Sequence, residues 1–150
     1  MKIEDFSRWA RQLGDRVEKN ADHLVRTCAL AIDGAVVIAT PVDTGRARAN
    51  WQVQLDNPAT STREPFAPGQ EGSTGGENAR AAIEEGKGVI ASYKGGRPNA
   101  CIHITNNLPY IGRLNDGWSA QAPAAFVEKG IMVGVKAIRN TGGIVSRNPT

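Results

Sequence analysis

The chain begins with an amphipathic segment, residues 3–39, that is long enough to dominate any fold the sequence can adopt. Apolar side chains recur along it at steps of three and four residues, the spacing of one face of an α-helix. Beyond Leu24 the segment is apolar nearly all round, with Asp33 as the exception. We therefore expect one long helix that ends before Pro41 and whose second half is buried in the domain or against another subunit. The apolar stripe consists of Ile3, Phe6, Trp9, Ala10, Leu13, Val17, Ala21, Leu24, Cys28, Ala31, Ile32, Ala35 and Val36.

The rest of the sequence predicts a small antiparallel sheet and further helices. "WQVQLD" (51–56) and "ACIHIT" (100–105) alternate apolar and polar side chains, as half-buried strands do. The other expected elements are a short helix over 77–93 that passes into a strand near 89–93, a turn at 95–99, a helical turn around 110–114 and a last helix over 124–140. The inner side of that last helix is expected to carry Phe126, Val127, Ile131, Val135 and Ile138. This order predicts an α+β fold, with a long N-terminal helix and a C-terminal helix packed on a small antiparallel sheet.

Residues 57–76, "NPATSTREPFAPGQEGSTGG", read as a long flexible loop. Phe66 is the only large apolar side chain among many Pro, Gly, Ser and Thr residues. Such a segment cannot offset the entropy of its own ordering by its own contacts. We interpret it as a mobile arm that orders on a partner, with Arg63, Glu64 and Phe66 as its interface residues. On that interpretation, deletion of 60–74 leaves a folded chain that no longer joins its partners.

Composition indicates a single domain, 1–150, with a lean core. The chain has 17 glycines and 8 prolines but only three Phe, three Trp and two Tyr, so much of its apolar content is alanine. The formal net charge of +3 can be assigned to the C-terminal end, including the tail 141–150. That excess suggests either an acidic partner surface or nearby nucleic acid, or simply cations that suit a helix C-terminus.

Cysteine and histidine usage excludes the common metal sites and favours a reducing compartment. The alternatives for Cys28 and Cys101 are a disulfide and two buried free thiols, and their apolar context favours the thiols. His23 and His103 form no cluster with them, so no metal ligand set is expected. The sequence predicts neither a signal peptide nor a membrane span, and we expect a soluble protein without a cofactor.

The stretch "TPVDTGRARANW" (40–51) raises the question of catalysis, because Asp-Thr-Gly also occurs in aspartic proteases. That chemistry needs a second aspartate and strands around the turn, whereas a long helix precedes this one. No phosphate-binding glycine motif or nucleophile–base context is present either. We interpret Pro41, Asp43, Thr44 and Gly45 as a structural turn, capped by Asp and Thr side chains, with Gly45 in an unusual backbone conformation. Trp51 is expected to anchor the following strand in the core.

Two segments together resemble the tail-component family of tail completion, or head–tail joining, proteins of long-tailed bacteriophages. Members of that family show a helix ending in a Pro-x-Asp-Thr-Gly-x-Leu-x-x-Ser type segment, which Pro41, Asp43, Thr44 and Gly45 match, while Ala47 and Asn50 depart from the usual leucine and serine. A second feature is a Tyr-Ala-x-x-x-Glu-x-Gly type segment followed by a Pro-and-Phe element that opens the last helix. The residues of 109–131 that match it are Tyr110, Leu114, Gly117, Ser119, Pro123 and Phe126, with Asn115 or Asp116 in the usual glutamate region.

The resemblance implies a virion structural protein rather than an enzyme. It implies a homo-oligomeric ring of six or twelve copies at the head–tail junction, assembled in the host cytoplasm. The implied partners are the tail tube or terminator and the head connector, around the passage for genomic DNA. Tyr110, Trp118 and Phe126 are then expected to anchor the packing of the second segment. The alternative is a small nonspecific DNA-binding accessory protein, since Arg46, Arg48, Arg63, Lys94, Arg97 and the C-terminal cations could contact phosphates.

Overall fold

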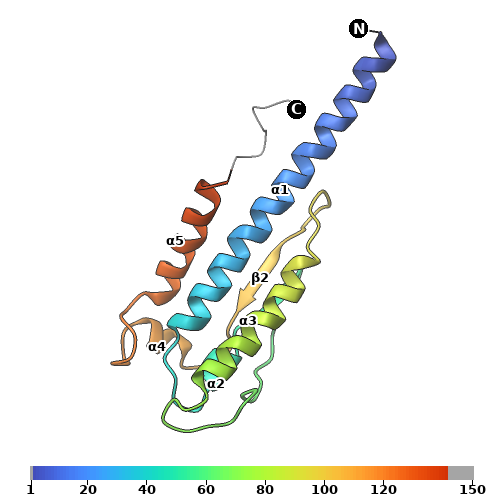
Figure 1. Ribbon diagram of the computed structural model, residues 1–150. Helices are drawn as coiled ribbons and strands as arrows, with labels where there is room; N and C mark the ends of the chain where they lie inside the picture. Colours follow the sequence, from blue (N-terminus) through green and yellow to red (C-terminus); the bar gives the residue numbers. More distant parts are fainter. Residues whose placement is uncertain (1, 142–150) are drawn as a thin grey trace.

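A computed structural model describes residues 2–141 of the 150-residue chain, so of the predicted tail 141–150 all but Thr141 lies outside the described residues. The architecture is α+β, as predicted (Figure 1). Along the chain the elements are α1 (Ile3–Ala39), α2 (Arg46–Ala49), β1 (Gln52–Leu55), α3 (Gly75–Ala91), β2 (Ile102–Thr105), α4 (Ile111–Asn115) and α5 (Phe126–Arg139).

Helix α1 is the axis of the molecule. Its 37 residues form one continuous helix, about 55 Å long at about 1.5 Å per residue. Helix α5 lies along one side of its C-terminal half, and α3 lies on the other side with β2 (Figure 1). The N-terminal part of α1 extends beyond these elements, while the C-terminal half carries the buried residues Ala29, Asp33, Val36 and Val37. The prediction of one long helix is confirmed, but its second half is buried only in part, since Val25, Leu30 and Ile38 are exposed.

The sheet has two antiparallel strands, β1 and β2, in which Gln52 pairs with Thr105 and Leu55 with Ile102. Both strands were predicted, but the further strand near 89–93 is wrong, because α3 continues to Ala91. Ile90 is fully buried and packs with Val53 of β1 and Ala29 of α1. The apolar run that suggested a strand is therefore the end of a helix whose contact face meets the sheet and α1.

The main core cluster lies where α1, α3 and the start of α5 meet. It contains Val36, Val37, Trp51, Ala79, Ala82, Ala122 and Phe126. Trp51 and Phe126 are both buried there, in agreement with their prediction as packing anchors. Alanine supplies three of the seven residues, so the helices approach closely around two large aromatic side chains.

Helix α5 meets α1 through glycines. A Cβ atom added at Gly130 would lie 2.5 Å from Cγ1 of Val36, and one at Gly134 would overlap with Ile32. These two glycines are buried, whereas Ile131, predicted on the inner side, is 47% exposed. The prediction for Ile131 is wrong because it ranked side chains by hydrophobicity, while this interface selects residues small enough for backbone contact.

Both cysteines are free and partly exposed, so the preference for free thiols over a disulfide is supported, although neither thiol is fully buried. The Cys101 Sγ atom lies 3.0 Å from Nε2 of His103. Among residues 2–141, none of the helices combines the length and the apolar character that crossing a lipid bilayer requires.

Candidate functional site: the corner between α1 and α2

The predicted turn connects two helices. After Ala39 the chain becomes extended at Thr40, as expected for a residue that precedes proline, and Gly45 then adopts φ +85° before α2 begins at Arg46. The structural turn was predicted, but α2 was not, since the turn was expected to lead directly into the strand. Four residues, Arg-Ala-Arg-Ala, are too few to show a helical periodicity in the sequence.

Gly45 is required at the corner for two reasons. Its φ of +85° lies in the left-handed region, which L side chains rarely adopt. An added Cβ atom would also overlap with the amide of Asn78, which is fully buried at the start of α3. The corner therefore sits directly against α3.

Asp43 and Thr44 were predicted to cap their own turn, and only Thr44 does so. Its Oγ1 atom accepts a hydrogen bond from the Arg46 N–H over 3.4 Å. Oδ1 of Asp43 instead accepts from the N–H of Glu71 at 3.2 Å, and its backbone carbonyl accepts from the N–H of Gly72 at 2.8 Å. The prediction for Asp43 is corrected: it binds the far end of the 57–76 segment to the corner.

Thr40 is a central residue of the corner that the sequence did not single out. Its hydroxyl donates to the Val36 carbonyl at 2.6 Å and accepts from Nε1 of Trp51 at 2.7 Å. Nε of Arg48 donates to the Thr40 carbonyl at 2.9 Å. All of Thr40 is buried, so these bonds join the end of α1, α2 and the start of β1 without competition from water.

Gln121 connects the second predicted segment to the corner. The Val42 N–H donates to its Oε1 atom at 2.8 Å, and its Nε2 atom donates to the Val42 carbonyl at 2.9 Å. This pair of bonds imitates the bonding of a neighbouring strand. The two sequence segments that carry the family resemblance therefore meet in space, through a residue of the second segment that is not among its matched positions.

The segment 57–76 is irregular until α3 begins at Gly75, but it does not extend from the domain as an arm. Three asparagines bind its backbone: the Nδ2 atoms of Asn50, Asn78 and Asn107 donate to the carbonyls of Arg63, Ala67 and Ala59, each at 2.7 Å. Asn50 and Asn78 also accept from the N–H groups of Arg63 and Ala67. The interpretation as a detached arm is therefore wrong, because neighbouring elements supply the ordering contacts that the segment itself lacks. Deletion of 60–74 would remove the Ala67 and Thr74 partners of the buried Asn78 amide and the Arg63 partners of Asn50, so it does not isolate an assembly function.

The expected interface residues of this segment have partners within the chain. The Arg63 guanidinium lies 2.7 Å from a carboxylate oxygen of Glu85 and 4.4 Å from the centre of the Phe66 ring. Glu64 lies 3.5 Å from the Arg46 guanidinium. These contacts hold the segment along α2 and α3.

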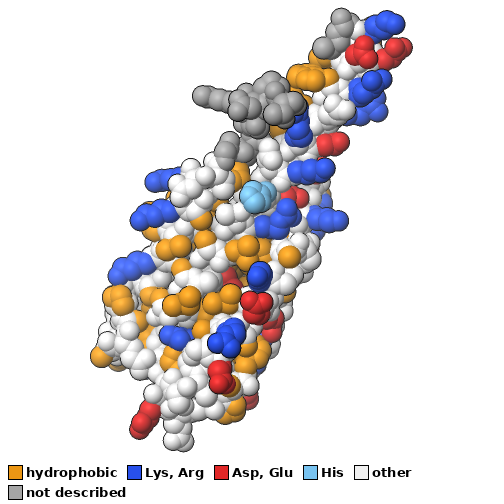
Figure 2. All heavy atoms as spheres, viewed as in Figure 1, with side chains coloured by type: hydrophobic (Ala, Val, Ile, Leu, Met, Phe, Trp, Pro, Cys, Tyr) orange, Lys and Arg blue, Asp and Glu red, His pale blue; other side chains and the backbone are white. Residues whose placement is uncertain are grey.

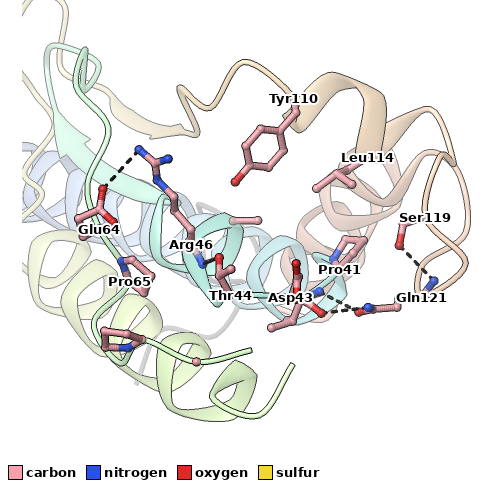
Figure 3. A pocket seen from close by; sticks show the side chains of 14 residues that line it. Pro41, Asp43, Thr44, Arg46, Glu64, Pro65, Tyr110, Leu114, Ser119 and Gln121 are labelled. Carbon is pink, nitrogen blue, oxygen red and sulfur yellow. Dashed lines mark hydrogen bonds and ion pairs between the residues drawn. The ribbon is translucent and has the colours of Figure 1, made fainter. Parts of the chain in front are cut away.

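A cavity of about 790 Å³ opens at the corner (Figure 3). Residues 41–47, 64–69 and 110–121 contribute its walls. Its apolar lining includes Pro41, Pro65 and Leu114, while Arg46, Glu64 and Gln121 place polar groups around it. Tyr110 points its ring into the cavity (Figure 3), and partial burial raises the pKa of its hydroxyl above the ordinary value. Tyr110 is thus a cavity residue, not the buried packing anchor that was predicted.

Trp118 was predicted to anchor the second segment, and the structure corrects this. Its side chain is 75% exposed, and the Arg113 guanidinium lies 5.5 Å from the centre of its ring. Ala122 and Phe126 occupy the core position instead. Sequence alone could not distinguish them, since an isolated Trp in an irregular loop has no periodicity that assigns it to a face.

Titratable side chains line part of the cavity. Its titratable groups are Asp43, Arg46, Glu64 and Tyr110, and Glu64 already pairs with Arg46. Within residues 2–141 no group of three or more His, Cys, Asp or Glu side chains could hold a metal ion. Comparisons of the chain with protein-family models, with curated proteins and with solved structures found no match.

Proposed function

We propose that this chain is a virion structural protein of a long-tailed bacteriophage, located at the head–tail junction. Copies of it form a closed ring that completes the tail and joins it to the head connector around the DNA passage. The proposed partners are the tail tube or terminator on one side and the connector on the other. This role needs no catalysis.

The observation that carries the assembly role is a pair of different exposed apolar surfaces on one chain. The first is the projecting N-terminal end of α1, where Ile3, Phe6 and Trp9 are exposed. The second lies over the C-terminal half of α1 and α5, where Ile38 and Val133 are exposed. Two non-identical surfaces on one subunit support a head-to-tail interface, which generates rings when the rotation closes. The motif resemblance described above supports the assignment to a phage virion.

The corner supports the same role. A ring subunit must hold its long helix at a constant angle to the rest of the domain. Contacts of Thr40 with Trp51, of Gly45 with Asn78 and of Gln121 with Val42 fix that angle. The contacts of the 57–76 segment add two fully buried asparagines to this framework. Such a framework suits a subunit that keeps one shape within an assembly.

The test is immunogold labelling of phage particles from the source lysate, viewed by electron microscopy, together with native mass spectrometry of the purified chain. We expect gold at the head–tail junction and a ring of six or twelve copies. Particles without gold at any position would contradict the proposal. In that case, salt-dependent binding of the free chain to DNA would favour the accessory DNA-binding alternative.

A further inference from the structure

The N-terminal end of α1 carries an apolar stripe that no other element of residues 2–141 covers. The N-terminal stripe consists of Ile3, Phe6 and Trp9, whose exposed fractions are 85%, 55% and 47%. The Phe6 and Trp9 rings contact each other with centroids 5.9 Å apart. Large apolar side chains that cluster on one helix face and remain exposed indicate a contact surface.

A groove with a mainly apolar lining lies at the opposite end of α1. The α1–α5 groove is a cavity of about 320 Å³, whose apolar lining includes Ala35, Ile38, Pro123, Phe126, Gly130 and Val133. Ile38 is 62% exposed and Val133 45% exposed at its edges. Figure 2 shows hydrophobic side chains gathered over this region, with basic side chains along the α5 edge.

The stripe and the groove of one chain cannot meet. Phe6 and Ile38 lie on the same uninterrupted helix, about 48 Å apart at about 1.5 Å per residue. No hinge in α1 lets the stripe fold back. The two surfaces can therefore associate only between different molecules.

The charges at the two surfaces are complementary. Arg48 and Lys129 are the charged residues that line the groove, and among residues 2–141 neither forms an ion pair with a carboxylate. The Arg48 guanidinium donates to the carbonyls of Ile38, Thr40 and Gly75, and burial lowers its pKa below the ordinary value. The groove thus presents cationic charge without a neutralising anion.

The first turn of α1 supplies the opposite charge. It contains Glu4 and Asp5. Asp5 lies one helical turn before Trp9, at the flank of the stripe. Its ion pair with Arg8, at 3.9 Å, is exposed on both sides and therefore exchanges readily.

We infer that the N-terminal stripe of one copy docks in the α1–α5 groove of the next copy, with Phe6 in the cavity near Val133 and Asp5 near Lys129. The contact is head-to-tail, so each copy uses both surfaces once. The inference rests on the proposed function only for the closure of the chain of copies into a ring. The interface itself is defined by the residues above.

Site-directed disulfide cross-linking tests this contact in the full chain. In a Cys28→Ser/Cys101→Ser background, Phe6→Cys and Val133→Cys are made separately and together. We expect mixed single variants to give one cross-linked dimer on a non-reducing gel, and the double variant to give a ladder of multiples. The matched control is Arg11→Cys with Val133→Cys, because Arg11 lies on the opposite face of α1 from Phe6 and should give no ladder.

Charge reversal provides a second measurement that does not depend on cysteine chemistry. Lys129→Glu should weaken self-association about fivefold, as for the loss of one exposed ion pair, and Asp5→Lys in the same chain should restore it. Sedimentation velocity measures both. If Asp5→Lys does not restore the self-association of the Lys129→Glu variant, the pairing of Asp5 with Lys129 is wrong.

The outcomes separate this interface from the proposed function. Cross-linking of Phe6→Cys alone would overturn the inference, since the stripes would then pair with each other. Rings that form without a link between positions 6 and 133 would overturn the inference but leave the proposed function standing. A ladder from the double variant, with no gold at the head–tail junction, would support the interface and contradict the proposed function.

Discussion

The carboxyl group of Asp33 in α1 is buried against α3, and within residues 2–141 its Oδ1 atom has no hydrogen-bond partner. A Cβ atom added at Gly86 would lie 2.6 Å from the other oxygen of Asp33, so the glycine in α3 leaves room for the carboxyl group. Burial, and next the Glu85 carboxylate, raise the pKa of Asp33 to about 7 from 3.8. In the folded state, Asp33 is therefore mainly protonated at acidic pH.

The raised pKa of Asp33 predicts that the free energy of unfolding decreases as pH rises. Because the pKa of Asp33 is higher in the folded than in the unfolded chain, the folded chain keeps the Asp33 proton to a higher pH. The stability that this proton contributes is fully present below about pH 4 and is lost as pH rises through about 7. Asp33→Asn removes that dependence and should raise the free energy of unfolding at pH 8 by up to about 4 kcal/mol. Urea denaturation at pH 5 and pH 8 measures this, with the exposed Asp15→Asn as control. Equal pH slopes in the parent and Asp33→Asn would contradict the assignment.

A substitution at Thr40 tests the hydrogen bond between the corner and Trp51. Thr40→Val keeps the volume but removes the acceptor for the buried Trp51 indole N–H, which should cost about 1–3 kcal/mol. Thr44→Val, at an exposed position of the same turn, should stay within about 0.5 kcal/mol. Urea denaturation followed by tryptophan fluorescence compares them. A similar loss in both variants would show that the hydroxyl of Thr40 is not the connection between α1 and β1.

At the scale of elements, the contact between α1 and α5 depends on small residues rather than on apolar area. Gly130→Ala would place a methyl group 2.5 Å from Cγ1 of the buried Val36, so α5 must shift, at a cost of about 1–3 kcal/mol. Gly88→Ala in α3 meets open space and should stabilise by up to about 1 kcal/mol. Thermal unfolding of the two variants provides the comparison. Stabilisation by Gly130→Ala would mean that the helices are less closely packed than described.

Element prediction from the sequence succeeded where the spacing of apolar side chains repeats within the element and failed where it does not. Helix α1 and strands β1 and β2 were predicted because apolar spacing repeats within each. Helix α2 was missed, and the end of α3 was taken for a strand, because a few β-branched or small residues are compatible with several backbone conformations. In α3 the contacts of Ile90 with Val53 and Ala29 determine the outcome, and these contacts are far apart in the sequence.

At the scale of the whole molecule, α1 gives the chain its length and its two separate apolar surfaces. Because it is one uninterrupted helix, the N-terminal stripe and the α1–α5 groove remain far apart in every copy, and contact between them must be intermolecular. The same helix also carries Asp33 and ends next to Thr40, so the pH dependence, the corner and the assembly contact all involve one continuous element.

The sequence by itself determined the long helix, the two strands, the last helix and the turn at Gly45, because each follows from local spacing or from a backbone conformation that one residue type adopts. Only the tertiary structure decided that Trp118 is exposed, that Tyr110 lines a cavity and that the 57–76 segment lies against the domain. It also decided the roles of Thr40, Asn50, Asn78 and Gln121. The physical reason is that a buried polar side chain is stabilised by the particular group it meets, and hydrogen-bond partners distant in the chain leave no pattern in the sequence.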